Sequence, residues 1–161
     1  MHGFRLKTLV VALSLAACAA ASAATAASPA MARPTRLERG DVIAGALSLS
    51  QAMHIVIGLK LQNRAELDAY ISRPGFKPLT GAQFVARYSP SQAQVQAVAN
   101  FLKHQGFTNV KISSNRILVS GDAPAANVQR AFGVSLVRVK THDGRIAYAN
   151  TNDATLPASM Q

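Results

Sequence analysis

The stretch MHIVIGLKLQ, residues 53–62, alternates apolar and other side chains with a period of two. That period is typical of a β-strand, whose successive side chains point to opposite faces of a sheet. One face would carry Ile55, Ile57, Leu59 and Leu61, and the other His54, Val56, Gly58 and Lys60. Because a strand cannot bury an apolar face alone, the rest of the chain must supply partner strands and a covering layer.

A short helix is predicted directly after this strand. Asn63 with Glu66 three residues later forms a capping pattern, and apolar residues then recur at helical spacing. The sequence Arg73-Pro74-Gly75 ends the helix.

The stretch LTGAQFVARYSPS, residues 79–91, contains two more helix starts. Thr80 and Gln83 can cap each other reciprocally, and Leu79 can pack against Phe84 as a hydrophobic staple. The second start is either Ser89 with Pro90 in the first helical position, or Ser91 with Gln94, and this longer helix ends at Gly106. The predicted capping and staple residues are therefore Thr80, Gln83, Phe84, Ser89 and Ser91.

The remaining elements complete a mixed pattern. Residues 109–113 and 116–120 alternate and predict a pair of strands, and Asp122 with Pro124 predicts the start of a helix that ends at Gly133. Residues 135–140 and 145–149 predict a final two-stranded ribbon around an Asp-Gly turn.

This order predicts an α+β fold, in which an antiparallel sheet of the split βαβ, ferredoxin-like type has helices on one face. The open face of that sheet would mix aliphatic and cationic side chains, whereas a merely solvated face is more polar. We therefore predict a partner-docking face. Its residues are His54, Val56, Lys60, Leu118, Leu136, Arg138 and Lys140.

The N-terminal segment predicts export. Arg5 and Lys7 precede a short apolar run and then small residues, which is the pattern of a secretory signal peptide over residues 1–24 rather than of a membrane span. Leu15-Ala16-Ala17-Cys18 also matches the box before a lipid-modified cysteine, so Cys18 is a candidate lipidation site. The favoured reading is an ordinary signal cut near residue 24, giving a secreted or periplasmic protein. Residues 25–46, rich in Ala, Ser and Pro, are predicted to be a flexible leader, with order beginning near Met53.

Charge and cysteine content restrict the partners. The chain has 17 basic residues, of which 15 remain when Arg5 and Lys7 are left out, and it has 7 acidic residues. The remaining net charge of +8 favours an acidic partner. The cations are scattered, and residues 109–113 and 116–120 hold no aromatic residue on which RNA bases could stack, so we predict no nucleic-acid binding. Since Cys18 is the only cysteine, the exported part has neither a disulfide nor a thiolate metal site.

No catalytic or metal site is predicted. The histidines outside the signal are His54, His104 and His142, and no acidic residue stands at a motif spacing from a serine that would suggest a triad. All three are interpreted as surface histidines, and no cofactor is expected for this chain.

Four segments together carry a family resemblance. They are LSLSQAMHIVIGLKLQNRAELDAYI, LTGAQFVARYSPSQAQVQAVANFLKHQGF, NRILVSGDAPAANVQRAFGVSL and YANTNDATLP. In this order and spacing, from Leu47 to Pro157, they resemble the N-terminal activation domain of the sedolisin family, the serine-carboxyl peptidases that include kumamolisin. The resemblance implies an activation domain at 47–157 that keeps a protease inactive, assists its folding and is removed by self-cleavage at acidic pH. Its partner would be a sedolisin-type catalytic domain, in cis or in trans.

The chain also departs from this family. Gly81 stands where the family usually has proline after the Leu-Thr pair, so the first cap should be weaker. The family's catalytic domain, with its Ser, Glu and Asp residues and its calcium site, would include a Gly-Thr-Ser sequence, which this chain lacks. Residues 158–161 are therefore interpreted as the start of a linker or a truncated end, and the chain itself as no enzyme. The alternative is a stand-alone envelope interaction protein or lipoprotein that has kept the leader fold.

Overall fold

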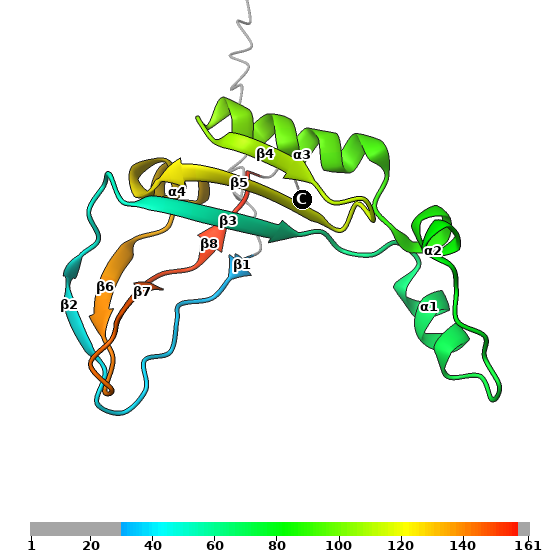
Figure 1. Ribbon diagram of the computed structural model, residues 1–161, viewed down its shortest axis with the longest axis horizontal. Coiled ribbons are helices and arrows are strands. Elements are labelled where there is room, and N and C mark those ends of the chain that lie inside the picture. The colour runs from blue at the N-terminus through cyan, green and yellow to red at the C-terminus, as the bar shows by residue number, and fades with distance from the viewer. Residues whose placement is uncertain (1–29, 158–161) are drawn as a thin grey trace, which may run out of the picture.

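The computed structural model describes residues 30–157, which form an α+β domain with antiparallel sheets (Figure 1). The predicted fold class is confirmed. The elements are β1 (Ala30–Ala32), β2 (Val42–Ala46), β3 (Ala52–Gly58), α1 (Arg64–Ile71), α2 (Gly81–Tyr88), α3 (Gln92–His104), β4 (Thr108–Ile112), β5 (Leu118–Pro124), α4 (Ala125–Phe132), β6 (Leu136–Lys140), β7 (Ile146–Asn150) and β8 (Ala154–Thr155). No helix within residues 30–157 is long and apolar enough to cross a bilayer. The predicted signal peptide at 1–24, Cys18 within it, and residues 158–161 lie outside the described residues.

The central sheet consists of β3, β5 and β4 in that order, with antiparallel neighbours. This is the arrangement of the first, third and second strands of a split βαβ unit. The predicted alternation in β3 is confirmed, because His54 and Val56 are exposed while Ile57, on the face toward the helices, is buried. Since α3 packs on β4 and β5 and α4 packs on β3 and β5, the helices cover one face and the other stays open.

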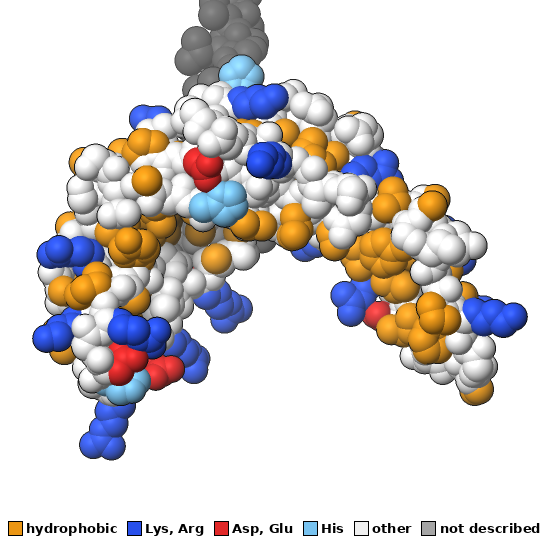
Figure 2. Space-filling view, viewed as in Figure 1, with side chains coloured by type: hydrophobic (Ala, Val, Ile, Leu, Met, Phe, Trp, Pro, Cys, Tyr) orange, Lys and Arg blue, Asp and Glu red, His pale blue; other side chains and the backbone are white. Residues whose placement is uncertain are grey.

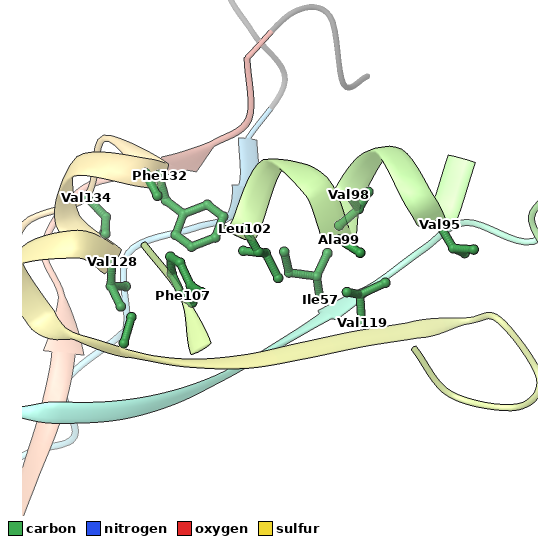
Figure 3. Packing of buried hydrophobic residues seen from close by; sticks show 12 residues of the cluster. Ile57, Val95, Val98, Ala99, Leu102, Phe107, Val119, Val128, Phe132 and Val134 are labelled. Atoms are coloured by element: carbon green, nitrogen blue, oxygen red, sulfur yellow. The ribbon is translucent and has the colours of Figure 1, made fainter. Parts of the chain in front are cut away.

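The core lies between this sheet and the two helices (Figure 3). Leu102 of α3 packs over Ile57 and Val119 of the sheet, and Leu102 and Val119 are both 0% exposed. The ring of Phe132 on α4 meets the ring of Phe107 edge-on, with centroids 6.1 Å apart. Each fully buried aliphatic side chain contributes roughly 1.5–3 kcal/mol, so this cluster anchors the sheet from which the open face is built.

Both predicted capping boxes are present. The Thr80 hydroxyl accepts from the Gln83 amide at 3.2 Å, while Gln83 Oε1 accepts from the Thr80 amide at 2.9 Å. Ser91 and Gln94 repeat the arrangement at the start of α3, at 3.2 and 2.9 Å.

Three other capping predictions are wrong. Asn63, which was predicted to cap with Glu66, precedes α1 in a left-handed conformation and makes no side-chain cap. Ser89 ends α2 instead of starting α3, and its buried hydroxyl has no hydrogen-bond partner among the described residues. Asp122 lies within β5, and α4 is preceded by Pro124, which makes no side-chain cap. The strand continues through Asp122 because its backbone pairs with β3 up to Pro124, and this pairing outweighs the local helix-start signal.

A second antiparallel sheet has the order β2, β6, β7. The prediction that order begins near Met53 is therefore wrong, since Val42 already pairs with Lys140 and Ala46 with Val137. The strand predicted at 135–140 also belongs to this second sheet and not to the central one. Its backbone pairs with β2 and β7 on its two sides, and this leaves no edge for β3.

The domain has the shape of an arch (Figures 1 and 2). The central sheet and α3 form its top, the β2-β6-β7 sheet forms one side, and an arm made of α1 and α2 forms the other. The open face of the central sheet points away from α3 and toward the space between the two sides. A ribbon of β1 and β8 joins the beginning and the end of the described chain.

Candidate docking surface

The open face of the central sheet has an apolar centre. Val56 on β3 is 54% exposed and Leu118 on β5 is 42% exposed. These side chains lie near each other because Val56 pairs with Ser120 and Gly58 pairs with Leu118 in the register of the two strands. An exposed aliphatic pair on a sheet face without covering helices is a typical feature of a binding surface.

An open hollow of about 330 Å³ lies over this centre. It is lined by His54, Val56, Lys111, Ile112, Ser113, Leu118 and Ser120. The sequence analysis did not include Lys111, although the alternation of residues 109–113 places it opposite to the buried side. The hollow therefore combines an aliphatic floor with a cation at its margin, which suits an aliphatic side chain and a carboxylate of a partner.

A polar cluster borders the hollow. His54 Nδ1 lies 2.5 Å from Asp122 Oδ1, and Asn109 Nδ2 donates to Asp122 Oδ2 at 2.9 Å. These hydrogen bonds, first that of His54 and then that of Asn109, hold the pKa of Asp122 below its usual value, against a smaller opposing effect of burial. The sequence analysis missed this pair because it placed Asp122 at a helix start, whereas in the sheet His54 and Asp122 are direct cross-strand neighbours.

The seven predicted docking residues do not lie on one sheet. His54, Val56 and Leu118 share the open face of the central sheet, and Lys60 is exposed just beyond β3. Leu136, Arg138 and Lys140 lie on β6 in the second sheet. Leu136 is also half-buried and packs against the core, so it is not a free contact residue.

The second sheet has a mixed face of its own. Lys140 lies between Val42 and Ile146 across the three strands, and Arg138 pairs with Tyr148. Val42, Ile146 and Tyr148 are 62%, 60% and 48% exposed, and the sequence analysis did not include them. The alternation of residues 145–149 could have predicted that Ile146 and Tyr148 lie on the exposed face of this sheet.

Arg138 is positioned by the strand beside it. Its Nη2 donates to the Ala44 carbonyl at 3.2 Å and lies close to Gly45. Gly45 has a φ of +112° and lies at an irregularity of the pairing between β2 and β6. Such a φ strains any residue other than glycine, so Gly45 permits the bulge that the Arg138 side chain crosses.

The two remaining histidines lie elsewhere on the surface, as predicted. His142, in the turn between β6 and β7, donates its amide to Asp41 Oδ1 at 2.9 Å, and its Nδ1 lies 3.5 Å from the same oxygen. His104 is exposed in the last turn of α3. Within residues 30–157 no three His, Cys, Asp or Glu side chains are grouped so that they could hold a metal ion.

The central sheet thus presents an uncovered face with an apolar centre and a cation at its margin. The chain belongs to the family described as "Pro-kumamolisin, activation domain", whose profile matches residues 40–161. This confirms the resemblance drawn from the sequence.

Two relatives support the assignment. The chain is 37% identical over 121 residues to Sedolisin of Pseudomonas sp. (strain 101) and 36% identical over 122 residues to Xanthomonalisin of Xanthomonas sp. (strain T-22). Each alignment covers 71% of this chain but only 20% and 15% of the respective relative. The chain is therefore similar to a propeptide-like region of these proteins.

Proposed function

We propose that this chain is a propeptide-type inhibitor and folding assistant of an exported sedolisin-family acid protease, which it binds in cis or in trans. The proposal rests above all on the match to the activation domain family over residues 40–161. It is supported by the uncovered sheet face, because the side chains of Val56 and Leu118 at its apolar centre are both more than two-fifths exposed.

In this proposal the open face of the central sheet contacts the catalytic domain. Val56 and Leu118 would form the dehydrated centre of the interface, and Lys111 and Lys60 would meet carboxylates at its margin. Arg138 and Lys140 of the second sheet would meet further carboxylates on the same partner. Acidification protonates such carboxylates and weakens the pairs, which accounts for release at acidic pH.

An inhibition assay tests the docking face. The exported chain is titrated against a mature sedolisin-type catalytic domain, such as that of the Pseudomonas relative, at the highest pH that still permits activity. Val56→Asp places an unpaired charge in the proposed centre, and we expect it to raise the inhibition constant by about tenfold or more, as for a central interface residue. Leu49→Asp is the matched control, because Leu49 is 62% exposed but lies outside both sheets.

Equal inhibition by Val56→Asp and the wild type would exclude the central sheet as the contact surface. If Arg138→Glu together with Lys140→Glu leaves inhibition unchanged, the second sheet takes no part in it. Absence of inhibition by every variant and by the wild type would refute the propeptide function.

The alternative of a stand-alone envelope lipoprotein depends on Cys18. Palmitate labelling of the expressed protein that disappears in Cys18→Ala would support a lipid anchor, whereas an unlabelled wild type would support a plain signal peptide.

A further inference from the structure

The α1 helix is held to the domain without any buried residue of its own. It has only 8 residues, and Asn63 before it has a φ of +49° and makes no side-chain cap. So short a helix is not stable alone in water. Its position must therefore come from contacts that its side chains make with the neighbouring helix.

Glu66 makes the central contact. Its Oε1 accepts hydrogen bonds from Arg87 Nη2 and, at 3.2 Å, from the Tyr88 hydroxyl. Tyr88 is 0% exposed and is therefore held by its surroundings, so Glu66 joins α1 to a buried side chain of α2. A hydrogen bond from a guanidinium to a carboxylate is about twice as strong as a neutral one.

The other contacts converge on the same two residues of α2. The Gln62 amide donates to the Tyr88 carbonyl at 2.8 Å, and Asn63 Nδ2 donates to the Arg87 carbonyl at 3.2 Å. The Arg87 guanidinium also lies 5.6 Å from the ring centre of Tyr70 and 5.2 Å from that of Tyr88. These contacts all reach the last turn of α2, while Gln62 Nε2 also donates to Gln94 Oε1 of α3 at 3.1 Å and the Tyr70 hydroxyl donates to the Lys77 carbonyl at 2.7 Å.

This fastening borders the proposed docking face. Lys60 and Leu61 lead directly from β3 into α1, and the arm extends from that end of the sheet, away from α3 and along one side of the broad concavity (Figures 1 and 2). A partner seated against the open face would have the arm beside it. The orientation of α1 therefore decides how wide that concavity is.

We propose that Glu66, Arg87 and Tyr88 form an acid-sensitive latch, and that protonation of Glu66 frees α1 and so weakens the grip of the domain on its partner. The effect of the latch on partner binding rests on the proposed function, but the latch itself is a property of the isolated chain. It places one acid trigger inside the propeptide, in addition to the carboxylates of the partner.

The sign of the pH dependence follows from the contacts. The hydrogen bond from Arg87 holds the pKa of Glu66 below its usual value of 4.5, opposed by burial and assisted by Tyr88 and the charges of Arg87 and Arg73. A group with a lowered pKa stabilises the closed arm above its unfolded pKa, and this stabilisation is lost as the pH falls through the folded pKa. The charged and titratable groups around Glu66 are Arg73, Arg87, Tyr70 and Tyr88. The latch is therefore closed at neutral pH and opens as the pH falls through the lowered pKa of Glu66, which lies below the usual value of 4.5.

Amide hydrogen exchange of the exported chain tests the latch without any protease. At pH 6.5 we expect Glu66→Gln, which keeps the shape but removes the charge, to lose protection over residues 64–71 by about threefold to tenfold relative to the wild type. Asp68→Asn is the matched control on the same helix, because Asp68 binds only Arg64 of its own helix through its carboxylate. Residues 95–102 of α3 report whether the fold is intact in each variant.

Two further measurements decide the proposal. After correction for intrinsic exchange rates, the wild type should lose protection over residues 64–71 between pH 6 and the most acidic pH at which residues 95–102 stay protected, while Glu66→Gln should show the same low protection at both. If the two proteins respond alike to pH, or if Asp68→Asn is as unprotected as Glu66→Gln, the latch is refuted.

The inhibition assay then separates the latch from the proposed function. A latch coupled to docking predicts that Glu66→Gln inhibits a sedolisin-type catalytic domain more weakly than Asp68→Asn, by about threefold or more. If α1 opens as expected but neither the variants nor the wild type inhibit, the proposed function fails and the latch stands. Equal inhibition by both variants, with an open α1, would refute the coupling.

Discussion

Replacing Gly81 by proline should stabilise the domain, because the backbone around this position already suits proline. Gly81 is the first residue of α2, where the amide has no partner within the helix and the fixed φ of proline matches the helical value. Thr80 before it has φ −68° and ψ 157°, the extended conformation that a following proline requires. A Cβ added at Gly81 meets no atom within 4 Å, so the ring has room at its point of attachment.

The expected gain follows from the unfolded chain, which loses freedom when glycine becomes proline. Such substitutions contribute about 0.4–1 kcal/mol where no strain is introduced. For a domain of this size that corresponds to a rise in melting temperature of roughly 1–4 °C. The gain should be measurable as global stability because Tyr88 at the other end of α2 belongs to the fully buried residues and ties the helix to the rest of the fold.

Thermal and urea unfolding of wild type, Gly81→Pro and Gly81→Ala would measure it. Gly81→Ala is the control that reduces backbone freedom without the ring, and it should give a smaller gain. A Gly81→Pro variant that is less stable than wild type while Gly81→Ala is more stable would refute the argument, because it would mean that the amide of residue 81 or its φ is needed in the native state.

Two further predictions concern local structure. Ser91→Ala should destabilise the domain by about 1 kcal/mol in urea unfolding through the lost cap of α3, whereas Ser89→Ala should be neutral or stabilising, because its buried hydroxyl has no partner among residues 30–157. Hydrogen bonds from Thr141 and Arg145 lower the pKa of Asp143 to about 2, so the carboxyl carbon of Asp143 should keep its chemical shift from pH 7 down to about pH 3. An Asp143 that titrates together with Glu66 in a carbon-detected NMR experiment would contradict this.

The features that the sequence predicts well are those determined by neighbours along the chain. The alternation around Ile57 and the boxes at Thr80 and Ser91 depend on residues two or three positions apart, and each appears in the structure as expected. The strand β2 was not predicted because all five of its residues are exposed and show no alternation. Its position depends on backbone hydrogen bonds to β6, and these leave no pattern in the side chains.

The two polar clusters could not be predicted for a related reason. His54 and Asp122 are 68 positions apart, and Glu66 and Arg87 are 21 apart, so their contacts depend on strand register and on the packing of two helices. Local rules assigned Asp122 and Glu66 to helix starts, where acidic residues are common. Glu66 does lie in the first turn of α1, but only the tertiary structure reveals that both carboxylates bind groups on other elements.

The ribbon of β1 and β8 has a mechanical consequence. Ala30 pairs with Thr155 and Ala32 with Ala154, so residues 30 and 155 lie next to each other at one end of a very short ladder. Tension applied between residues 30 and 157 would load these hydrogen bonds one after another, as in a zipper, rather than all together. A pull between two bodies joined through these ends would therefore peel the ribbon open first and leave the central sheet and its helices folded.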